Sequence, residues 1–230
     1  MNKLSNLKVI SHWLGDINGS PSEHPLLEFL DQIYTTGPSQ KEILNAQSKL
    51  QKTILSRHEL FVFYDSYFHP QIGEIFTAVT EKGLIAIDFG LSKEAFISQI
   101  ETKTARIASH SSEENKKITE QLRQYFQGQR QHFELAIDFH QITEFQNQVY
   151  RATSKVPYGQ VVTYADIARK LDKPGASRAV GQALRRNPIP FIIPCHRVIA
   201  SDGSLRGYKG NYGLEIKATL LKMEGCQLPI

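Results

Sequence analysis

The sequence predicts an α/β N-terminal domain, with a small antiparallel sheet and helices, followed by a mainly α C-terminal domain that contains a helix-turn-helix. Two observations support this prediction. Short β-branched and aromatic runs separated by glycine and proline occupy residues 61–89, which is typical of paired strands. Beyond Thr143 the apolar residues recur at helical spacing instead. We therefore expect segments at 1–58, 59–140 and 141–230.

The first segment, residues 1–58, carries no motif with a recognisable chemistry. Breaks at 18–21 and 37–39 divide it, and helical spacing of apolar residues indicates helices around 26–33 and 43–55. These features suggest packing or regulation. We interpret the segment as an N-terminal extension whose role the sequence does not reveal.

The second segment, residues 59–140, alternates strand and helix patterns. Pro70, Gly73 and Gly83 separate its first apolar runs, as turns between antiparallel strands would. The expected elements are strands at 61–63, 75–79, 84–89 and 132–139, and helices at 92–101 and 113–126.

A well-marked helix opens the third segment. Thr143 and Gln146 have the spacing of a capping box, in which each side chain satisfies a free backbone N–H of the first turn. Phe145 and Val149 then mark one apolar face, and the pattern stops before Pro157.

Two shorter helices follow and are joined by a turn that contains glycine. The first opens at Thr163 and repeats apolar residues at i, i+3, i+4 and i+7 from Tyr164, until the Pro-Gly pair at 174–175. The second covers 176–186 and stops before Pro188. This arrangement resembles a helix-turn-helix.

The second of these helices has two distinct faces. Its buried face is expected to consist of Ala176, Ala179, Val180, Ala183 and Leu184. Its other face presents small or basic residues, namely Ser177, Arg178, Gly181, Gln182 and Arg185. Such a face would let the helix backbone approach a phosphate-lined groove closely. Close packing against another helix, with the arginines in solvent, explains the same residues.

Charge is distributed unevenly along the 230 residues. From Arg151 to the end there are 13 Lys or Arg and 5 Asp or Glu, a net charge of +8; the remainder, with 27 − 13 = 14 and 23 − 5 = 18, carries −4. A basic C-terminal third suits a polyanion such as nucleic acid. A solvated basic surface that aids solubility is the alternative.

Composition excludes several classes of protein. The two cysteines, Cys195 and Cys226, are too few for a disulfide framework or a four-thiolate zinc site. No apolar run has the length of a membrane span, and the first ten residues lack the pattern of a secretory signal. We expect an intracellular protein, cytoplasmic and nucleoid-associated or nuclear, that does not interact with membranes.

A thiol and an imidazole are adjacent at Cys195 and His196, between apolar residues and after Pro194. A cysteine buried among aliphatic residues is normally inert with a raised pKa, whereas a nearby His or helix N-terminus makes its thiolate available. Both interpretations remain open on the residues alone. Adjacent residues in a strand point to opposite faces, so contact between the two side chains requires a turn or a bridging water.

From residue 139 to 225 the sequence resembles the O6-alkylguanine-DNA alkyltransferases, also called methylated-DNA-protein-cysteine methyltransferases. The motifs that carry the resemblance are Phe145-Gln146, Val156-Pro157-Tyr158-Gly159, Tyr164, Arg178-Ala179-Val180-Gly181, Asn187-Pro188, Pro194-Cys195-His196-Arg197-Val198, Gly207-Tyr208 and Glu224-Gly225. Residues 59–140 resemble the family's N-terminal domain loosely, and the residues before Glu59 match nothing in it.

The resemblance implies a catalytic set. Cys195 would be the alkyl acceptor, His196 would act through a water as its base, and Glu224 would orient His196. Asn187 would tie the active-site turn together. Glu224 also attracts attention by itself, because the dipole disfavours a carboxylate at the end of the helix expected at 214–223. A solvent-exposed glutamate remains the other interpretation.

The resemblance also implies a DNA-binding set and a substrate pocket. Arg178 would fill the gap left by an extruded guanine, and Tyr164 would press on the phosphate or base edge to favour extrusion. The helix would enter the minor groove, with Ser177, Gln182 and Arg185 also contacting DNA. Tyr208, Lys209 and Val198 would line the pocket. The stretch 207–213 is two residues longer than usual, with Lys209 where a small residue is common.

The function implied is DNA repair by irreversible, single-turnover transfer of a methyl or larger alkyl group from O6-alkylguanine to Cys195. O4-alkylthymine is a further candidate substrate. The protein would act as a monomer on double-stranded DNA and need no cofactor or metal. Two alternatives remain: a non-enzymatic sensor of alkyl lesions, although such relatives lack the cysteine, and a cysteine hydrolase, for which the sequence supplies no oxyanion-hole motif.

Overall fold

The computed structural model describes residues 39–55, 58–139, 142–208 and 213–226, within two units, Met1–Ser56 and Arg57–Ile230. In the first unit, α3 (Gln40–Leu55) begins three residues before the expected helix. Ser39 donates to Glu42 from both its backbone N and its hydroxyl, which stabilises the start of the helix. The breaks at 18–21 and 37–38 and the helix expected at 26–33 lie outside the described residues.

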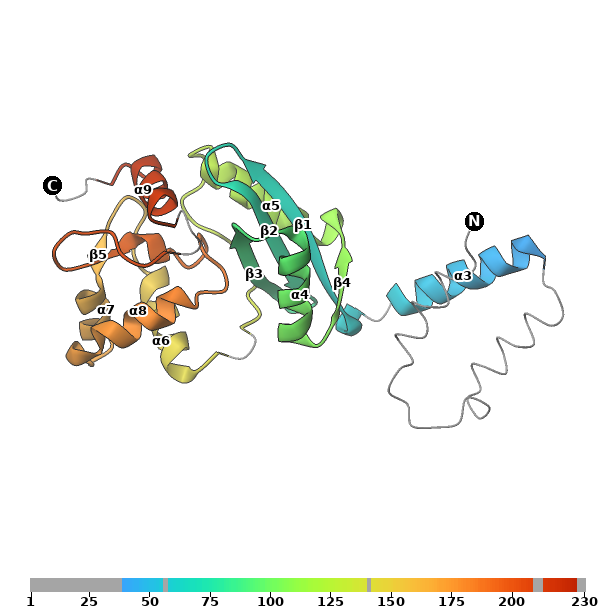
Figure 1. Ribbon diagram of the computed structural model, residues 1–230, viewed down its shortest axis with the longest axis horizontal. Helices are drawn as coiled ribbons and strands as arrows, with labels where there is room; N and C mark the ends of the chain where they lie inside the picture. Colours follow the sequence, from blue (N-terminus) through green and yellow to red (C-terminus); the bar gives the residue numbers. More distant parts are fainter. Residues whose placement is uncertain (1–38, 56–57, 140–141, 209–212, 227–230) are drawn as a thin grey trace. The chain divides into compact units, whose positions relative to one another are not determined.

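The second unit begins with a four-stranded sheet in the order β3-β2-β1-β4 (Figure 1). Its strands are β1 (Phe61–His69), β2 (Gly73–Thr80), β3 (Gly83–Phe89) and β4 (Ile107–His110). The first three pair antiparallel, as expected, but β4 pairs parallel to β1, so the sheet is mixed rather than antiparallel. The four residues of β4 are half-buried or exposed, and they gave no strand signal in the sequence.

The strand expected at 132–139 is reduced to a single bridge. Ile137 pairs with Leu84 at the edge of the sheet, where Leu84 N donates to Ala136 O and Asp138 N donates to Leu84 O. The expectation of a full strand was therefore wrong. This segment blunts the exposed edge of β3 without extending the sheet.

Helices α4 (Lys93–Thr104) and α5 (Ser112–Phe126) cover opposite faces of the sheet. Phe76 stacks on Phe96 of α4, whereas the neighbouring Thr77 donates to Asn115 of α5. Adjacent strand residues point to opposite faces, so the two helices must lie on different sides. An apolar cluster that includes Phe96 and Ile100 thus anchors α4, and buried polar contacts of Asn115 help to anchor α5.

The remaining residues form the helical part, which Figure 1 shows in yellow to red. Its elements are α6 (Glu144–Ser154), β5 (Val162–Thr163), α7 (Tyr164–Lys170), the 3₁₀ turn Pro174–Ala176, α8 (Ser177–Arg185), the 3₁₀ turn Cys195–Arg197, β6 (Val198–Ile199) and α9 (Gly213–Met223). The capping box of Thr143 and Gln146 is present, and Thr163 makes a second one with Asp166. Gly225, with φ of 73°, closes α9.

Helices α7 and α8 pack together through a short turn, as the sequence predicts. Val180, Ala183 and Leu184 are buried, whereas Ala179 is exposed, contrary to expectation. The parallel pair β5–β6 was not foreseen. It joins the residue before α7 to the residues that follow Cys195, since Val162 pairs with Val198 and Thr163 with Ile199. The start of α7 is thereby fixed beside the cysteine segment.

Contacts between the sheet and the helical part centre on the segment before Cys195. Ile87 of β3 donates its backbone N–H to Pro188 O at 2.8 Å, and Phe89 packs against Phe191 with ring centroids 5.4 Å apart. Phe191 adopts a left-handed backbone conformation, with φ of 72°, which is strained for an aromatic residue. Its packing offsets that strain. Within the described residues no helix has the length and apolarity of a membrane span.

Candidate active site and nucleic-acid interface

Cys195 lies on a 3₁₀ turn rather than in a strand. The turn Cys195–Arg197 directly precedes β6, and the Cys195 side chain is buried, with 7% of the residue exposed. A turn instead of a strand removes the geometric obstacle to placing the thiol and the neighbouring imidazole in one site. The cysteine's sequence neighbours Ile193, Pro194 and Val198 are buried as well.

Asn187 organises the segment that ends in Cys195. Its Oδ1 accepts the backbone N–H of Ile189 at 3.1 Å, and its Nδ2 donates to Ile193 O at 2.9 Å. The same Nδ2 lies 3.2 Å from Cys195 Sγ. Because Asn187 is buried and follows the last turn of α8, it joins that helix to the thiol. A donor on Sγ favours the thiolate form.

His196 is fully buried and faces Glu224. Its Nε2 lies 2.9 Å from Glu224 Oε1, and its Nδ1 has no hydrogen bond to any described residue. A carboxylate acceptor at Nε2 places the proton there, which leaves the Nδ1 lone pair available. Burial lowers the pKa of His196, although the hydrogen bond to Glu224 opposes this. The resting imidazole is therefore neutral near neutral pH.

Glu224 is buried, with 5% of the residue exposed, so the interpretation as a surface glutamate is wrong. Arg197 binds it through Nε to Oε2 at 2.8 Å and Nη2 to Oε1 at 2.9 Å, and Tyr125 OH donates to Oε1 at 2.5 Å. Burial raises the pKa of Glu224, but the hydrogen bonds from His196 and Arg197 overcome it and lower the pKa to about 2. These donors also offset the unfavourable dipole at the end of α9.

Three buried residues near this site were missing from the sequence-based set. Arg197 directly follows His196, so its position in the motif could have identified it as a site residue. In the structure it also donates to Val156 O. Tyr125 gave none, because its spacing in α5 marks it only as a core residue. Lys217 is fully buried and donates to Val198 O at 2.6 Å and Arg206 O at 3.0 Å. Burial lowers the pKa of Lys217 to about 8.

The residues expected to line a substrate pocket have different surroundings. The Tyr208 ring lies 5.7 Å from that of Phe89 and is nearly perpendicular to His196, at 6.5 Å. Its hydroxyl is buried without a hydrogen bond to any described residue, and burial raises its pKa well above 10. Val198 is fully buried in β6. Lys209 lies outside the described residues.

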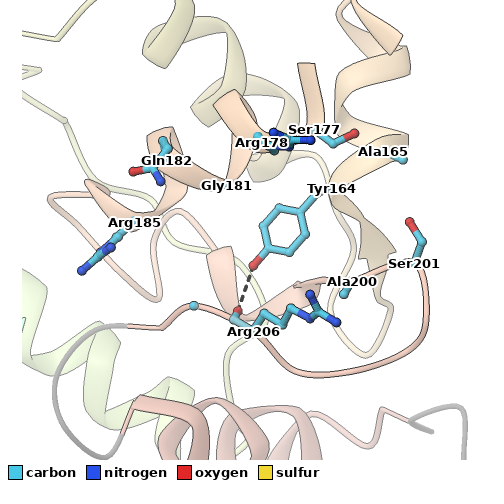
Figure 2. A pocket seen from close by; sticks show the side chains of 11 residues that line it. Tyr164, Ala165, Ser177, Arg178, Gly181, Gln182, Arg185, Ala200, Ser201 and Arg206 are labelled. Carbon is cyan, nitrogen blue, oxygen red and sulfur yellow. Dashed lines mark hydrogen bonds between the residues drawn. The ribbon is translucent and has the colours of Figure 1, made fainter. Parts of the chain in front are cut away.

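An open groove of about 480 Å³ runs between α8, the start of α7 and the segment 200–207; we call it the α8 groove (Figure 2). The described residues that line it are Tyr164, Ala165, Ser177, Arg178, Gly181, Gln182, Arg185, Ala200, Ser201, Arg206 and Gly207. They include every residue that the sequence assigned to DNA contact. They also include three arginines. Arg206 is paired with Asp202, whereas Arg178 and Arg185 make no ion pair with any described residue, which favours an anionic ligand.

Tyr164 lies in the α8 groove with its ring against Gly181, where an added Cβ would lie 3.9 Å from the ring. Its hydroxyl donates to Arg206 O at 2.9 Å, the contact drawn as a dashed line in Figure 2. The same carbonyl accepts from Lys217. Burial raises the pKa of Tyr164 to about 12, and the nearby Cys195 contributes to the shift. Through its second bond, to Val198 O, Lys217 connects this wall of the groove to the strand that follows the Cys195 turn.

Known proteins resemble this chain in both of its parts. The model of the 6-O-methylguanine DNA methyltransferase ribonuclease-like domain matches residues 62–139, and that of the corresponding DNA binding domain matches residues 144–226. A methylated-DNA–protein-cysteine methyltransferase of Methanosarcina barkeri is 44% identical over 167 residues, 71% of this chain and 97% of that protein. The constitutive one of Bacillus subtilis is 39% identical over 154 residues, 66% and 90% of the two chains.

Solved structures agree with the sequence relatives. The O6-methylguanine methyltransferase of Mycobacterium tuberculosis aligns with a TM-score of 0.61 and 32% identity, over 73% of this chain and 95% of that one. The structure of OGT from the same organism in complex with DNA aligns with a TM-score of 0.60 and 32% identity, over 71% and 92%. Among the described residues, no group of three or more His, Cys, Asp or Glu could hold a metal ion.

Proposed function

The chain belongs to the 6-O-methylguanine DNA methyltransferase family, and we propose that it repairs DNA by transferring an alkyl group from O6 of guanine to Cys195. The observation that carries the proposal is the buried set of Cys195, His196 and Glu224, which we call the relay, beside a basic groove. A buried thiol next to a neutral base supplies a nucleophile, and the groove supplies a binding face for DNA.

The transfer is an in-line displacement. His196 Nδ1 takes the thiol proton through a water, and the thiolate of Cys195 attacks the alkyl carbon. The carbon–O6 bond breaks, its electron pair stays on the guanine, and the proton on His196 returns to the purine. The products are guanine in DNA and S-alkylcysteine. A thioether has no ready route back to a thiol, so each molecule reacts once.

Access to Cys195 requires that the guanine leave the duplex, because a base inside the stack cannot present its O6 substituent to a buried thiol. Two residues of the α8 groove are suited to this step: Arg178, which is exposed, and Tyr164, which is half-buried. Arg178 fills the vacated position in the duplex, and Tyr164 presses on the backbone to favour extrusion. Ser177, Gln182 and Arg185 bind the flanking phosphates. Tyr208 lies beside the base.

We propose that the protein acts where DNA is, in the cytoplasm or the nucleus. It binds as a monomer to double-stranded DNA that contains O6-alkylguanine. Methyl and larger alkyl groups, and O4-alkylthymine, are candidate substrates.

Intact-mass measurement of the full chain tests the proposal. The protein is incubated with a duplex oligonucleotide that carries one O6-methylguanine, and with the unmethylated duplex as a control. We expect the protein mass to rise by one methylene unit with the methylated duplex alone, and peptide mapping to place it on Cys195. Binding without any mass change would identify a lesion sensor instead, and neither binding nor transfer would overturn both functions.

A further inference from the structure

Tyr125 connects two parts of the second unit through the active site: the sheet with its helices, residues 58–139, which we call the first domain, and the helical part, residues 142–226, which we call the second domain. It belongs to α5, which covers the sheet of the first domain, yet its hydroxyl reaches the relay in the second. The ring is fully buried and packs against Phe133, at 5.3 Å between centroids, and against Phe191, at 6.5 Å. The first domain therefore supplies a polar group to the chemistry as well as a scaffold.

The hydroxyl has one partner in hydrogen-bonding range that can accept its proton. Tyr125 OH lies 2.5 Å from Glu224 Oε1 and 3.4 Å from His196 Nε2. Since Nε2 already carries the proton that it donates to Glu224, the tyrosine donates to the carboxylate as well. Burial and the carboxylate raise the pKa of Tyr125 well above 10, so the phenol stays protonated and remains a donor.

Arg197 already orients the carboxylate. Its guanidinium contacts both oxygens of Glu224, which fixes the plane of the group without help from the tyrosine. What Tyr125 adds is a third donor on Oε1, the same oxygen that accepts from His196. Every donor on an acceptor oxygen withdraws some of the negative charge that the other donors experience.

We propose that Tyr125 is a positioning residue for alkyl transfer, whose hydrogen bond to Glu224 limits how strongly that carboxylate supports a charged His196. The proposal rests on the proposed function, because its effect is on the proton transfer from Cys195. With Tyr125 in place the resting site holds a neutral imidazole. Without its hydroxyl, Glu224 binds the imidazolium more tightly, and proton transfer from the thiol becomes more favourable.

Other charged and titratable groups also face the relay and must stay constant in any test. Around His196 and Glu224 they are Arg197 on the 3₁₀ turn, Tyr158 and Tyr208 in loops, Lys217 on α9 and Cys226 after it, and towards Cys195 they are Tyr150 on α6 and Tyr164 on α7. A change at Tyr125 alone leaves each of them in place. Shifts in the pH dependence can then be attributed to the missing hydroxyl.

Tyr125→Phe tests the proposal, with Tyr150→Phe as its matched control. Tyr150 is also buried, but its hydroxyl donates to the backbone carbonyl of Ala183 at 3.1 Å rather than to the relay. Histidine ¹⁵N NMR of the full chain, titrated from acid to neutral pH, gives the pKa and tautomer of His196. We expect the pKa of His196 to rise by about half a unit in Tyr125→Phe, since one of several charge-assisted bonds is lost, and to stay at the parent value in Tyr150→Phe.

The second measurement is the single-turnover rate against pH, with saturating O6-methylguanine duplex. We expect the plateau rate to increase in Tyr125→Phe, because proton transfer from the thiol is more favourable. The midpoint of the rising limb should move up by about half a unit, because the neutral base forms at the raised pKa of His196. Site-specific 3-fluorotyrosine at position 125, which keeps the ring and strengthens the donor, should move the midpoint down. This second variant keeps the test valid if Tyr125→Phe fails to fold.

The proposal is overturned if Tyr125→Phe has the same His196 pKa and midpoint as the parent, or if its midpoint moves down. Equal shifts in Tyr125→Phe and Tyr150→Phe overturn it too, since they would reflect general loosening of the core. Failure of the parent chain to take up methyl would refute the proposed function instead, and the NMR titration would still decide whether Tyr125 acts on His196.

Discussion

Charged side chains in the relay and in the α8 groove differ in burial and in hydrogen bonding. In the relay, Glu224 is buried and accepts hydrogen bonds from His196, Arg197 and Tyr125. In the groove, Arg178 and Arg185 are exposed and make no hydrogen bond or ion pair with any described residue. A saturated network holds one fixed arrangement, whereas unpaired arginines can adapt to phosphates. The difference separates residues that set the chemistry from residues that recruit the substrate.

Cys195→Ala should separate chemistry from DNA binding most clearly, and its expected effect on the transfer rate is the largest. Without the thiol the transfer should be abolished, because no other group in the relay can accept the alkyl carbon. Affinity for methylated duplex should stay within a factor of about three of the parent, since DNA binding rests on the groove. Intact mass and fluorescence anisotropy measure the two quantities.

The control for this variant is Cys226→Ser, which should react like the parent. Cys226 is half-buried at the end of α9, and burial raises the pKa of its thiol. An alkyl group found on Cys226 in the Cys195→Ala protein would contradict the assignment of the acceptor.

Glu224→Gln should weaken the relay and the fold together. The change leaves the Arg197 guanidinium buried without a counter-charge, which costs about 3–5 kcal/mol of stability. Reaction with free O6-benzylguanine, which needs no extrusion, should slow at neutral pH and recover partly at higher pH, where the thiol ionises without the charged imidazole. Thermal unfolding and the pH–rate profile measure these effects.

The stability difference should depend on pH with a definite sign. The pKa of Glu224 is held at about 2 in the folded chain, below its unfolded value of about 4.3. Its contribution is therefore present above about pH 4.3 and lost as the pH falls towards 2. The gap in Tm between parent and Glu224→Gln should shrink over that window. The control is Glu215→Gln, an exposed position in α9, whose Tm should equal that of the parent at every pH. Separately, a pH–rate profile of Glu224→Gln that superimposes on that of the parent would remove Glu224 from the relay.

Arg178→Ala should have a smaller effect, confined to the groove. Repair of O6-methylguanine in duplex DNA should slow by about tenfold, a typical loss for one positioned contact, while reaction with free O6-benzylguanine should be unchanged. Rates on the two substrates, measured side by side, give the ratio. Arg186→Ala is the matched control, because Arg186 is an exposed arginine at the end of α8 outside the groove lining. Equal losses on both substrates would assign Arg178 to the fold.

Local signals in the sequence predicted much of the fold. The capping boxes at Thr143 and Thr163 depend on residues three apart, and both are present. The apolar face of α8 was predicted except for Ala176, which is half-buried in the turn before the helix, and Ala179, which is exposed. Successive helical residues are turned by about 100°, so Ala179 lies at the edge of the buried stripe formed by Val180, Ala183 and Leu184. The mixed sheet could not be predicted in the same way. The strand β4 is four residues long, and it is a strand because β1 offers it a free edge after the α4 crossover.

The residues of the candidate site also divide into those that local sequence patterns revealed and those that only the tertiary structure revealed. Cys195 and His196 were found because they are adjacent, and the face of α8 because its residues share one helix. Glu224 required the fold, since its surroundings decided between a surface glutamate and a buried acceptor. Lys217 and Tyr125 gave no signal of their own, because a lysine or tyrosine in a helix is ordinary until its partners are known.

The sequence by itself determined the main helices of the described residues, the three antiparallel strands and the adjacency of thiol and imidazole, because these depend on short-range backbone hydrogen bonding and side-chain spacing. The family resemblance implied Glu224 as the partner of the imidazole, but only the tertiary structure decided that this carboxylate is buried and that the Tyr125 hydroxyl shares it. Tyr125 and Glu224 are 99 residues apart in the chain, and their hydrogen bond exists because the sheet of the first domain packs against the segment before Cys195. Contacts of that range follow from how two apolar surfaces fit, which no local pattern encodes.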